Sequence, residues 1–173
     1  LPIYPSLVIS GRVQEQLSAV KDLTLRSFSS LDVLGSQTIG GDKARNLTLD
    51  AAQIQVKGEG SQFKVLAGGV NLLNTTDAQP AGAQGGTGQL NVVANGLNGG
   101  TGHITIGQGA VAVSGVAATN LQAAGSVVMS GQGGLTVPGV TASAGVVIGP
   151  GSLVDSVDGD DGVIDGFGQN GRS

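Results

Sequence analysis

The chain has 173 residues, about the length of one domain, and contains 32 glycines but no cysteine and no tryptophan. Without cysteine it can form neither a disulfide scaffold nor a thiolate metal site. Its formal charge of −4 arises from 12 acidic and 8 basic residues, and none of these lies between residues 78 and 150.

This uncharged stretch excludes several classes of function. Nucleic-acid binding needs lysine and arginine against phosphates and aromatic rings for stacking, and the stretch has neither. A basic membrane-surface patch is absent for the same reason, and no apolar run is long enough to insert into a membrane. With 39% hydrophobic residues the chain is too apolar to be disordered, so we expect a soluble folded chain, either mature or cut from a longer one.

Short triplets with an apolar, an outward-facing and an apolar residue recur along the chain between glycine, asparagine and serine. Alternation with period two is typical of a half-buried strand, and no stretch shows a convincing helical stripe. The triplets, which become looser toward the end of the series, lie at 23–25, 31–33, 47–49, 54–56, 63–65, 70–72, 90–92, 104–106, 111–113, 135–137 and 146–148.

The spacing of these triplets favours a solenoid over a sandwich or a barrel. Neighbouring triplets often start about 7 to 9 residues apart, and pairs recur at roughly 15 to 20. Sandwich cores usually need large aromatic side chains, and the middle of this chain has none. The sequence therefore predicts an all-β fold, a right-handed parallel β-helix of about six to eight coils.

The same geometry explains the missing charge. Equivalent residues of successive coils lie about 4.8 Å apart, so like charges would repel while amides and hydroxyls can hydrogen-bond along the stack. We interpret Asn71, Asn91, Thr105 and Thr136 as solvated positions of such ladders.

The predicted organisation is a β-helix segment over residues 1–150 and a Gly/Asp-rich tail or linker over 151–173. Residues 77–88 are small, rich in glycine and without alternation, which predicts a loop between coils. No Lys-Ser/Thr pair or helix follows this loop, so it does not predict a phosphate site.

Two places carry candidate ligands. His103 begins a predicted strand without an acidic neighbour, which favours a surface or capping role over that of a ligand or base. In the tail, carboxylates at close spacing are the type of ligand that Ca²⁺ prefers. Their spacing departs from known calcium loops, so we expect a solvated acidic linker, with Ca²⁺ as the alternative; the candidate ligands are Asp158, Asp160, Asp161 and Asp165.

No catalytic or cofactor-binding residue is predicted, and we expect the protein not to be an enzyme. Hydrolysis of glycans needs two carboxylates about 5 to 9 Å apart. Stacked coils could bring Asp32 near Asp50, so a polysaccharide-acting enzyme remains an alternative, as does a glycan-binding module on the β-helix.

Several segments resemble the filamentous haemagglutinin family of bacterial two-partner-secreted exoproteins. The most specific resemblance is that of residues 22–35, which contain a Ser-Phe-Ser-Ser-Leu-Asp corner. The other segments that resemble the family are 46–51, 66–74, 85–92 and the opening 1–7. The resemblance covers roughly residues 1–150. It implies a β-helical filament segment, secreted or at the cell surface of a Gram-negative bacterium and acting in adhesion or aggregation.

The resemblance also implies partners. Family members pair with an outer-membrane transporter through a secretion domain that is not recognisable here, so the chain is expected to be an internal segment of a precursor or a subunit processed from one. Other expected partners are glycans or proteins of host or bacterial surfaces. Because a parallel β-helix leaves unpaired backbone groups at both ends, we also expect end-to-end self-association into fibres.

Overall fold

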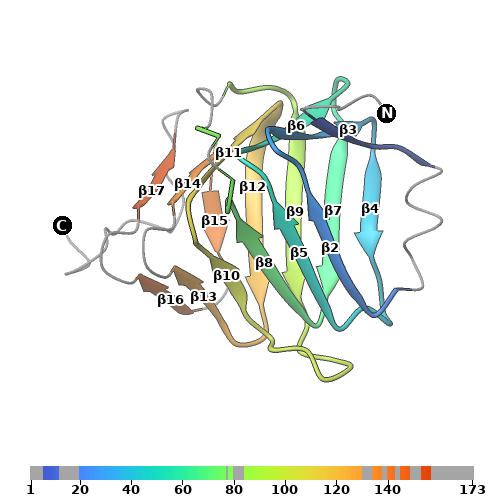
Figure 1. Cartoon of the computed structure of the whole chain (residues 1–173), viewed down its shortest axis with the longest axis vertical. Helices are drawn as coiled ribbons and strands as arrows, with labels where there is room; N and C mark the ends of the chain where they lie inside the picture. The colour runs from blue at the N-terminus through green and yellow to red at the C-terminus, as the bar shows by residue number, and fades with distance from the viewer. Residues whose placement is uncertain are drawn as a thin grey trace.

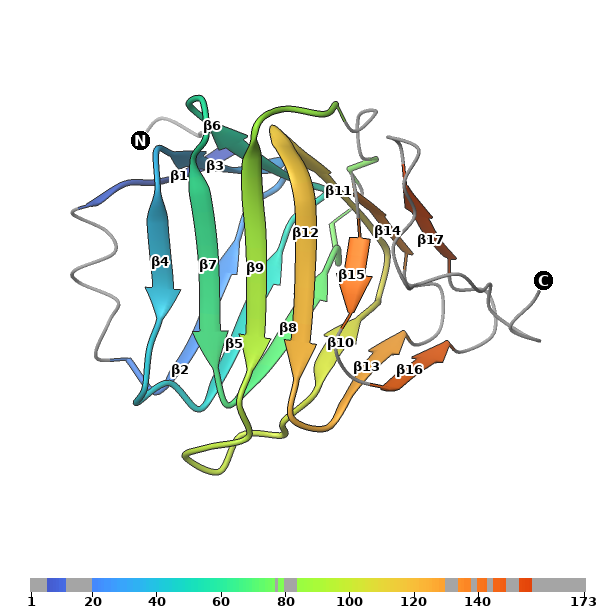
Figure 2. The same cartoon turned by 180° about the vertical axis from the view of Figure 1, so that it is seen from behind.

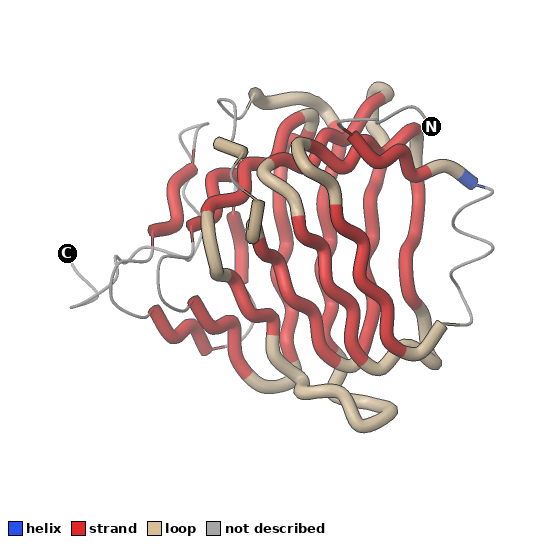
Figure 3. Tube along the Cα trace, viewed as in Figure 1, coloured by secondary structure: helices blue, strands red, loops and turns tan. Residues whose placement is uncertain are grey.

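The computed structural model describes residues 6–11, 20–76, 78–79 and 84–129, together with the backbone of four strands between residues 134 and 156. The strands form three parallel sheets that enclose one core (Figure 1). We name them sheets A, B and C. Loops at the corners lead from a strand of one sheet to a strand of the next (Figure 3).

Within each sheet all neighbouring strands run parallel. Sheet A contains, in spatial order, β1 (Ser6–Ile9), β3 (Ser30–Leu34), β6 (Gln53–Lys57), β11 (Ala110–Ser114), β14 (Gly134–Val137) and β17 (Leu153–Ser156). Sheet B contains β2 (Asp22–Arg26), β5 (Asn46–Asp50), β8 (Gly69–Leu73), β10 (Ile104–Ile106), β13 (Ser126–Met129) and β16 (Gly145–Ile148). Sheet C contains β4 (Gln37–Gly40), β7 (Gln62–Ala67), β9 (Gly88–Ala94), β12 (Val116–Ala123) and β15 (Val140–Ala142).

The chain visits sheets B, A and C in turn and so winds as a screw. In Figure 2 the strands of sheet C face the viewer and run downward while the chain advances from the N-terminal to the C-terminal side. This sense of winding is right-handed, as crossovers between parallel strands almost always are. The predicted fold, an all-β right-handed parallel β-helix, is confirmed.

The predicted number of coils was too high. Four turns carry a strand in all three sheets: β2–β4, β5–β7, β10–β12 and β13–β15. In sheet B equivalent residues are 24 apart from β2 to β5, 23 from β5 to β8 and from β10 to β13, 34 from β8 to β10, and 19 from β13 to β16. All but the last of these spacings exceed the roughly 15 to 20 residues expected. The expected spacing was too short because β4, β12 and β15 of sheet C do not carry the triplet pattern.

Every predicted triplet lies on a strand, and its outer residues face the core wherever side chains are described. In β5, for example, Leu47 and Leu49 are buried and Thr48 between them is half-exposed. Leu23 and Leu25 of β2 are only partly buried, because β2 is the first strand of its sheet and has a neighbour on one side only. Period-two alternation was thus a sufficient signal for the strands that it marked.

Apolar side chains stack along the axis of the screw from one coil to the next. One such row consists of Leu47, Val70, Ile104 and Val127, each fully buried and in register with the next. Burying an aliphatic side chain of this size stabilises the fold by about 1.5–3 kcal/mol relative to its exposure. The row therefore ties four successive coils together without requiring aromatic residues.

The strand stack continues beyond residue 150. The backbone of β17 (Leu153–Ser156) pairs with β14, with Val154 opposite Leu135. The predicted tail 151–173 therefore contains a strand of sheet A. Its remaining residues lie outside the described part of the chain.

Candidate functional site

One coil lacks its strand in sheet A, and this is the main irregularity of the screw. β8 of sheet B ends at Leu73 and β9 of sheet C begins at Gly88, and the residues described between them form no strand of sheet A. As a result β6 pairs directly with β11, with Ile54 opposite Val113, although sheets B and C each have one further strand at this level. We call the segment 74–87 the excursion.

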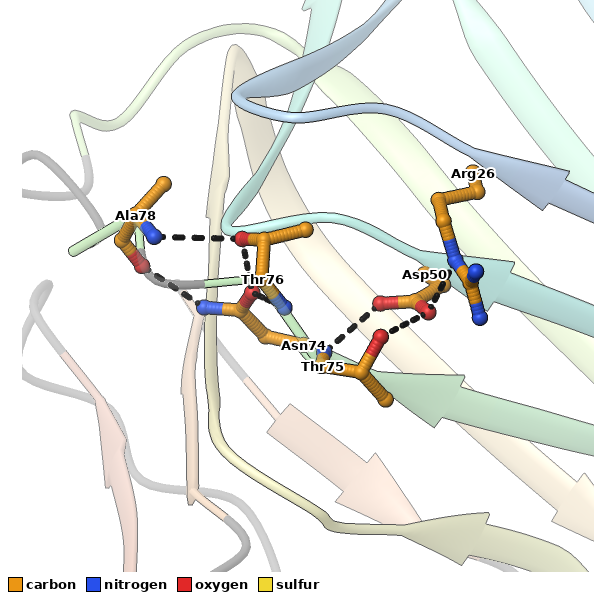
Figure 4. A network of polar contacts seen from close by, with 6 residues as sticks. All are labelled: Arg26, Asp50, Asn74, Thr75, Thr76 and Ala78. Atoms are coloured by element: carbon orange, nitrogen blue, oxygen red, sulfur yellow. Dashed lines mark hydrogen bonds and ion pairs between the residues drawn. The ribbon is translucent and has the colours of Figure 1, made fainter.

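The excursion begins at a buried carboxylate, Asp50, at the end of β5 (Figure 4). One carboxylate oxygen of Asp50 accepts a hydrogen bond of 2.8 Å from the backbone N–H of Thr75. The other accepts bonds from the Thr75 hydroxyl at 2.5 Å and from Nε of Arg26 at 2.8 Å. Arg26 lies one coil before Asp50 and Thr75 one coil after it, so this side chain joins three successive coils.

The environment of Asp50 favours its ionised form. Burial by itself raises the pKa of the carboxyl group, but the hydrogen bonds from Thr75 and the guanidinium of Arg26 outweigh burial and hold the pKa below its ordinary value. A carboxylate held in this way is an acceptor that anchors donors, and it is poorly suited to take up a proton in catalysis.

Asn74 fixes the direction in which the excursion leaves the stack. Its side-chain nitrogen donates to the carbonyl of Ala78 at 2.9 Å and to that of Ala110, in the next coil, at 3.0 Å. Its side-chain oxygen accepts bonds from the backbone N–H of Thr76 at 3.1 Å and from the Thr76 hydroxyl at 2.6 Å (Figure 4). The turn is therefore closed by side-chain bonds in place of a sheet ladder.

The excursion returns beside the end of β11. The backbone N–H of Gln84 donates to the hydroxyl of Ser114 at 3.0 Å, and the N–H of Gly115 donates to the carbonyl of Gln84 at 2.9 Å. Gly115 has a φ of +89°, and a Cβ on it would lie 1.9 Å from the carbonyl oxygen of Val56. Only glycine at this position allows the backbone after β11 to approach that of Val56 in β6 this closely.

A polar depression of about 380 Å³ lies where the excursion meets the outer face of sheet A. Ser114 accepts a second hydrogen bond there, of 3.1 Å, from the side-chain nitrogen of Gln53. The depression is lined by Gln53, Gln55, Val56, Lys57, Gln84, Gly85, Ser114 and Gly115.

The two carboxylates singled out from the sequence have separate partners. Asp32 lies on β3 of sheet A, where it accepts a hydrogen bond of 2.9 Å from the Ser30 hydroxyl and pairs with Lys57 at 3.5 Å. Asp50 lies at the end of β5 of sheet B and is bonded as described above. No contact joins the two carboxylates within the described residues.

Three ion pairs each join the coil of β2–β4 to the coil of β5–β7. They are Arg26–Asp50, Lys57–Asp32 and a close pair between Arg45 and Asp22. The hydrogen bond from Arg45 lowers the pKa of Asp22 and raises that of Arg45. Charge in this half of the protein therefore serves to align neighbouring coils.

His103 precedes β10 and is half-buried. Its Nδ1 accepts a hydrogen bond of 3.0 Å from the backbone N–H of Ser126, one coil further on. In the described structure the ring thus closes a corner between two coils, and no described carboxylate bonds to it.

Two of the predicted ladder positions bond to the neighbouring coil. The amide of Asn71 donates to the hydroxyl of Thr48 at 3.1 Å, and the amide of Asn120 donates to that of Asn91 at 2.7 Å. Thr105 is in register with Asn71. The side chain of Thr136 lies outside the described part, although the backbone of β14 places this residue beside Ala112.

The calcium candidates Asp158, Asp160, Asp161 and Asp165 lie outside the described residues. Among the residues that are described, no three histidine or carboxylate side chains gather as a metal site would require. None of the described helical segments has the length and apolar character needed to cross a membrane.

Comparison with known proteins returned no match: neither a family model, nor a curated protein, nor a solved structure resembles this chain significantly.

Proposed function

We propose that this chain is a structural and adhesive segment of a bacterial filament, secreted or displayed at the cell surface. The observation that supports this most directly is the continuous parallel stack of coils. Such a stack grows by about 4.8 Å per coil without changing its cross-section, which suits a rod that spaces or displays a surface.

The distribution of polar groups agrees with a structural role. The carboxylates of Asp22, Asp32 and Asp50 are each paired with a cation of the neighbouring coil. The amides of Asn71 and Asn120 likewise bond from coil to coil. In the described part of the chain these groups hold coils together, which is the requirement of a rod and not that of a catalytic centre.

The biological setting that we propose follows the resemblance of segments such as 22–35 to filamentous haemagglutinins. It comprises a Gram-negative bacterium, a longer precursor exported through an outer-membrane transporter, and contact with glycans or proteins of host or bacterial surfaces. End-to-end association of copies into fibres belongs to the same proposal.

Lengthening the rod tests the structural part of the proposal. Residue 127 lies in register with residue 104, so tandem copies of 104–126 can be inserted after residue 126. Ten copies are expected to lengthen the particle by about 48 Å in negative-stain images, with an unchanged β-type circular dichroism spectrum. A compact particle, or loss of the spectrum, would contradict the proposal.

Adhesion is tested with fluorescent beads coated with the chain and counted on epithelial and Gram-negative cell layers. The matched control is Val65→Asp, which buries an unpaired charge in the core and is expected to unfold the rod. Beads that carry the native chain should bind in larger numbers. Equal binding of the two kinds of bead would refute an adhesive role of the folded rod.

A further inference from the structure

We infer that the polar depression beside the excursion binds a short neutral glycan. This site rests on the contact with glycans that the proposed function includes. It does not depend on the spacing role of the rod, because a ligand in this depression would occupy the outer face of sheet A without altering the stack. The depression has a volume of about 380 Å³, which falls within the range of small-ligand sites.

Hydrogen-bond donors and acceptors remain unused in the depression. The Ser114 oxygen accepts two bonds, from Gln53 and from the backbone of Gln84, so its own O–H remains available to donate. The side-chain oxygen of Gln53 remains an acceptor. The half-buried amide of Gln55 makes no hydrogen bond to any other described residue, so both its donors and its acceptor are available.

The charge in the depression is balanced. Among the described residues that line the depression, Lys57 is the only one with a charged side chain, and Asp32 lies 3.5 Å from its ammonium group. The depression therefore offers donors and acceptors with its one cation already paired. Sugar hydroxyl groups both donate and accept, so a neutral polyhydroxylated ligand matches this set, whereas an anion would find no unpaired cation.

Glycine residues contribute to the shape of the depression. Gly85 and Gly115 leave backbone exposed at the lining, and at Gly115 no side chain can be accommodated. The depression lies where the described end of the excursion returns over β6 and β11, which pair directly with each other, and the bond from Gln84 to Ser114 fixes this return. Without an aromatic platform among the lining residues, we expect dissociation constants in the millimolar range.

The test is an NMR titration of the ¹⁵N-labelled full chain with cellotriose, maltotriose and galactotriose, and with trigalacturonate as the anionic comparison. We expect at least one neutral trisaccharide to shift the backbone or side-chain amide signals of Gln53, Gln55, Gln84 and Ser114. Gln55→Ala should weaken this binding about five- to ten-fold, as expected when one or two hydrogen bonds are lost.

The matched control is Gln122→Ala, which removes an exposed glutamine from β12 of sheet C and should leave binding unchanged. Ser114→Ala is a second binding variant, and each variant is first shown to retain the native spectrum. The inference is refuted if no neutral trisaccharide shifts these signals at 20 mM, if only trigalacturonate binds, or if Gln122→Ala weakens binding as much as Gln55→Ala. None of these outcomes affects the lengthening experiment on the rod, so the two proposals can fail separately.

Discussion

Replacing Asp50 with alanine tests whether its carboxylate holds three coils together. The substitution removes three hydrogen bonds to a charged acceptor, two from Thr75 and one from Arg26. The bond from the Thr75 backbone should account for about 1.5–3 kcal/mol of the free energy of unfolding and the hydroxyl bond for about 1 kcal/mol. The side chain of Arg26 is 58% exposed, so its ion pair adds less than about 1 kcal/mol.

We therefore expect Asp50→Ala to lower the free energy of unfolding by about 3 kcal/mol, which corresponds to a Tm about 6–12 °C lower for a chain of this length. Urea unfolding followed by far-UV circular dichroism measures this, because the chain has no tryptophan for fluorescence. Asp42→Ala is the matched control: it removes an exposed aspartate from a corner of the same region and should change the stability by less than about 0.5 kcal/mol. A loss below about 1 kcal/mol for Asp50→Ala would refute the anchoring role.

Three further predictions concern the same fold. The pKa of Asp50 is lowered in the folded state, so its contribution to stability is complete above the unfolded value of about 3.9 and is lost as the pH falls through the folded pKa. The native chain should therefore lose more stability between about pH 5 and 3 than Asp50→Ala does. Parallel pH profiles of the two chains would contradict this. Thr119→Val should raise the free energy of unfolding by about 1 kcal/mol, because the buried Thr119 hydroxyl has no partner among the described residues; a lower urea midpoint would show that the hydroxyl is bonded after all. Gly115→Ala should lower the free energy of unfolding by at least about 3 kcal/mol in the same assay, because its Cβ would clash with Val56. Gly35 has a φ of +72° but open space around it, so Gly35→Ala should lower the free energy by about 1 kcal/mol. Equal losses for the two variants would exclude the clash as the cause.

The strands that carry a triplet could be predicted because their signal is local. In the triplet of Leu47, Thr48 and Leu49, alternation shows which side chains are buried without any knowledge of the neighbouring coil. β4 has one buried apolar residue, Ile39, and β12 carries Thr119 at a core position, so neither shows the triplet pattern. The triplets therefore mark too few strands of sheet C. The number of coils was wrong for that reason.

The candidate site could be predicted only in part. A loop was expected over 77–88; residues 78–79 and 84–87 are the part of it that the structure describes outside a strand, and Gly88 already begins β9. The missing strand of sheet A, the direct pairing of β6 with β11 and the bond between Gln53 and Ser114 had no sequence signal, since 61 residues separate these two side chains. The run of Asn74, Thr75 and Thr76 directly after a strand is a capping signal that could have marked the start of the excursion.

The sequence by itself determined that this protein is a parallel stack of short strands, because the alternation of small aliphatic and neutral polar residues is compatible with a narrow core and uncharged ladders. Tertiary structure alone decided which coil would lack a strand, which carboxylate would be buried, and which glutamines and serine would meet on one face. These properties depend on register between residues 20 to 60 positions apart, and register is set by the packing of whole coils against each other, which no local pattern encodes.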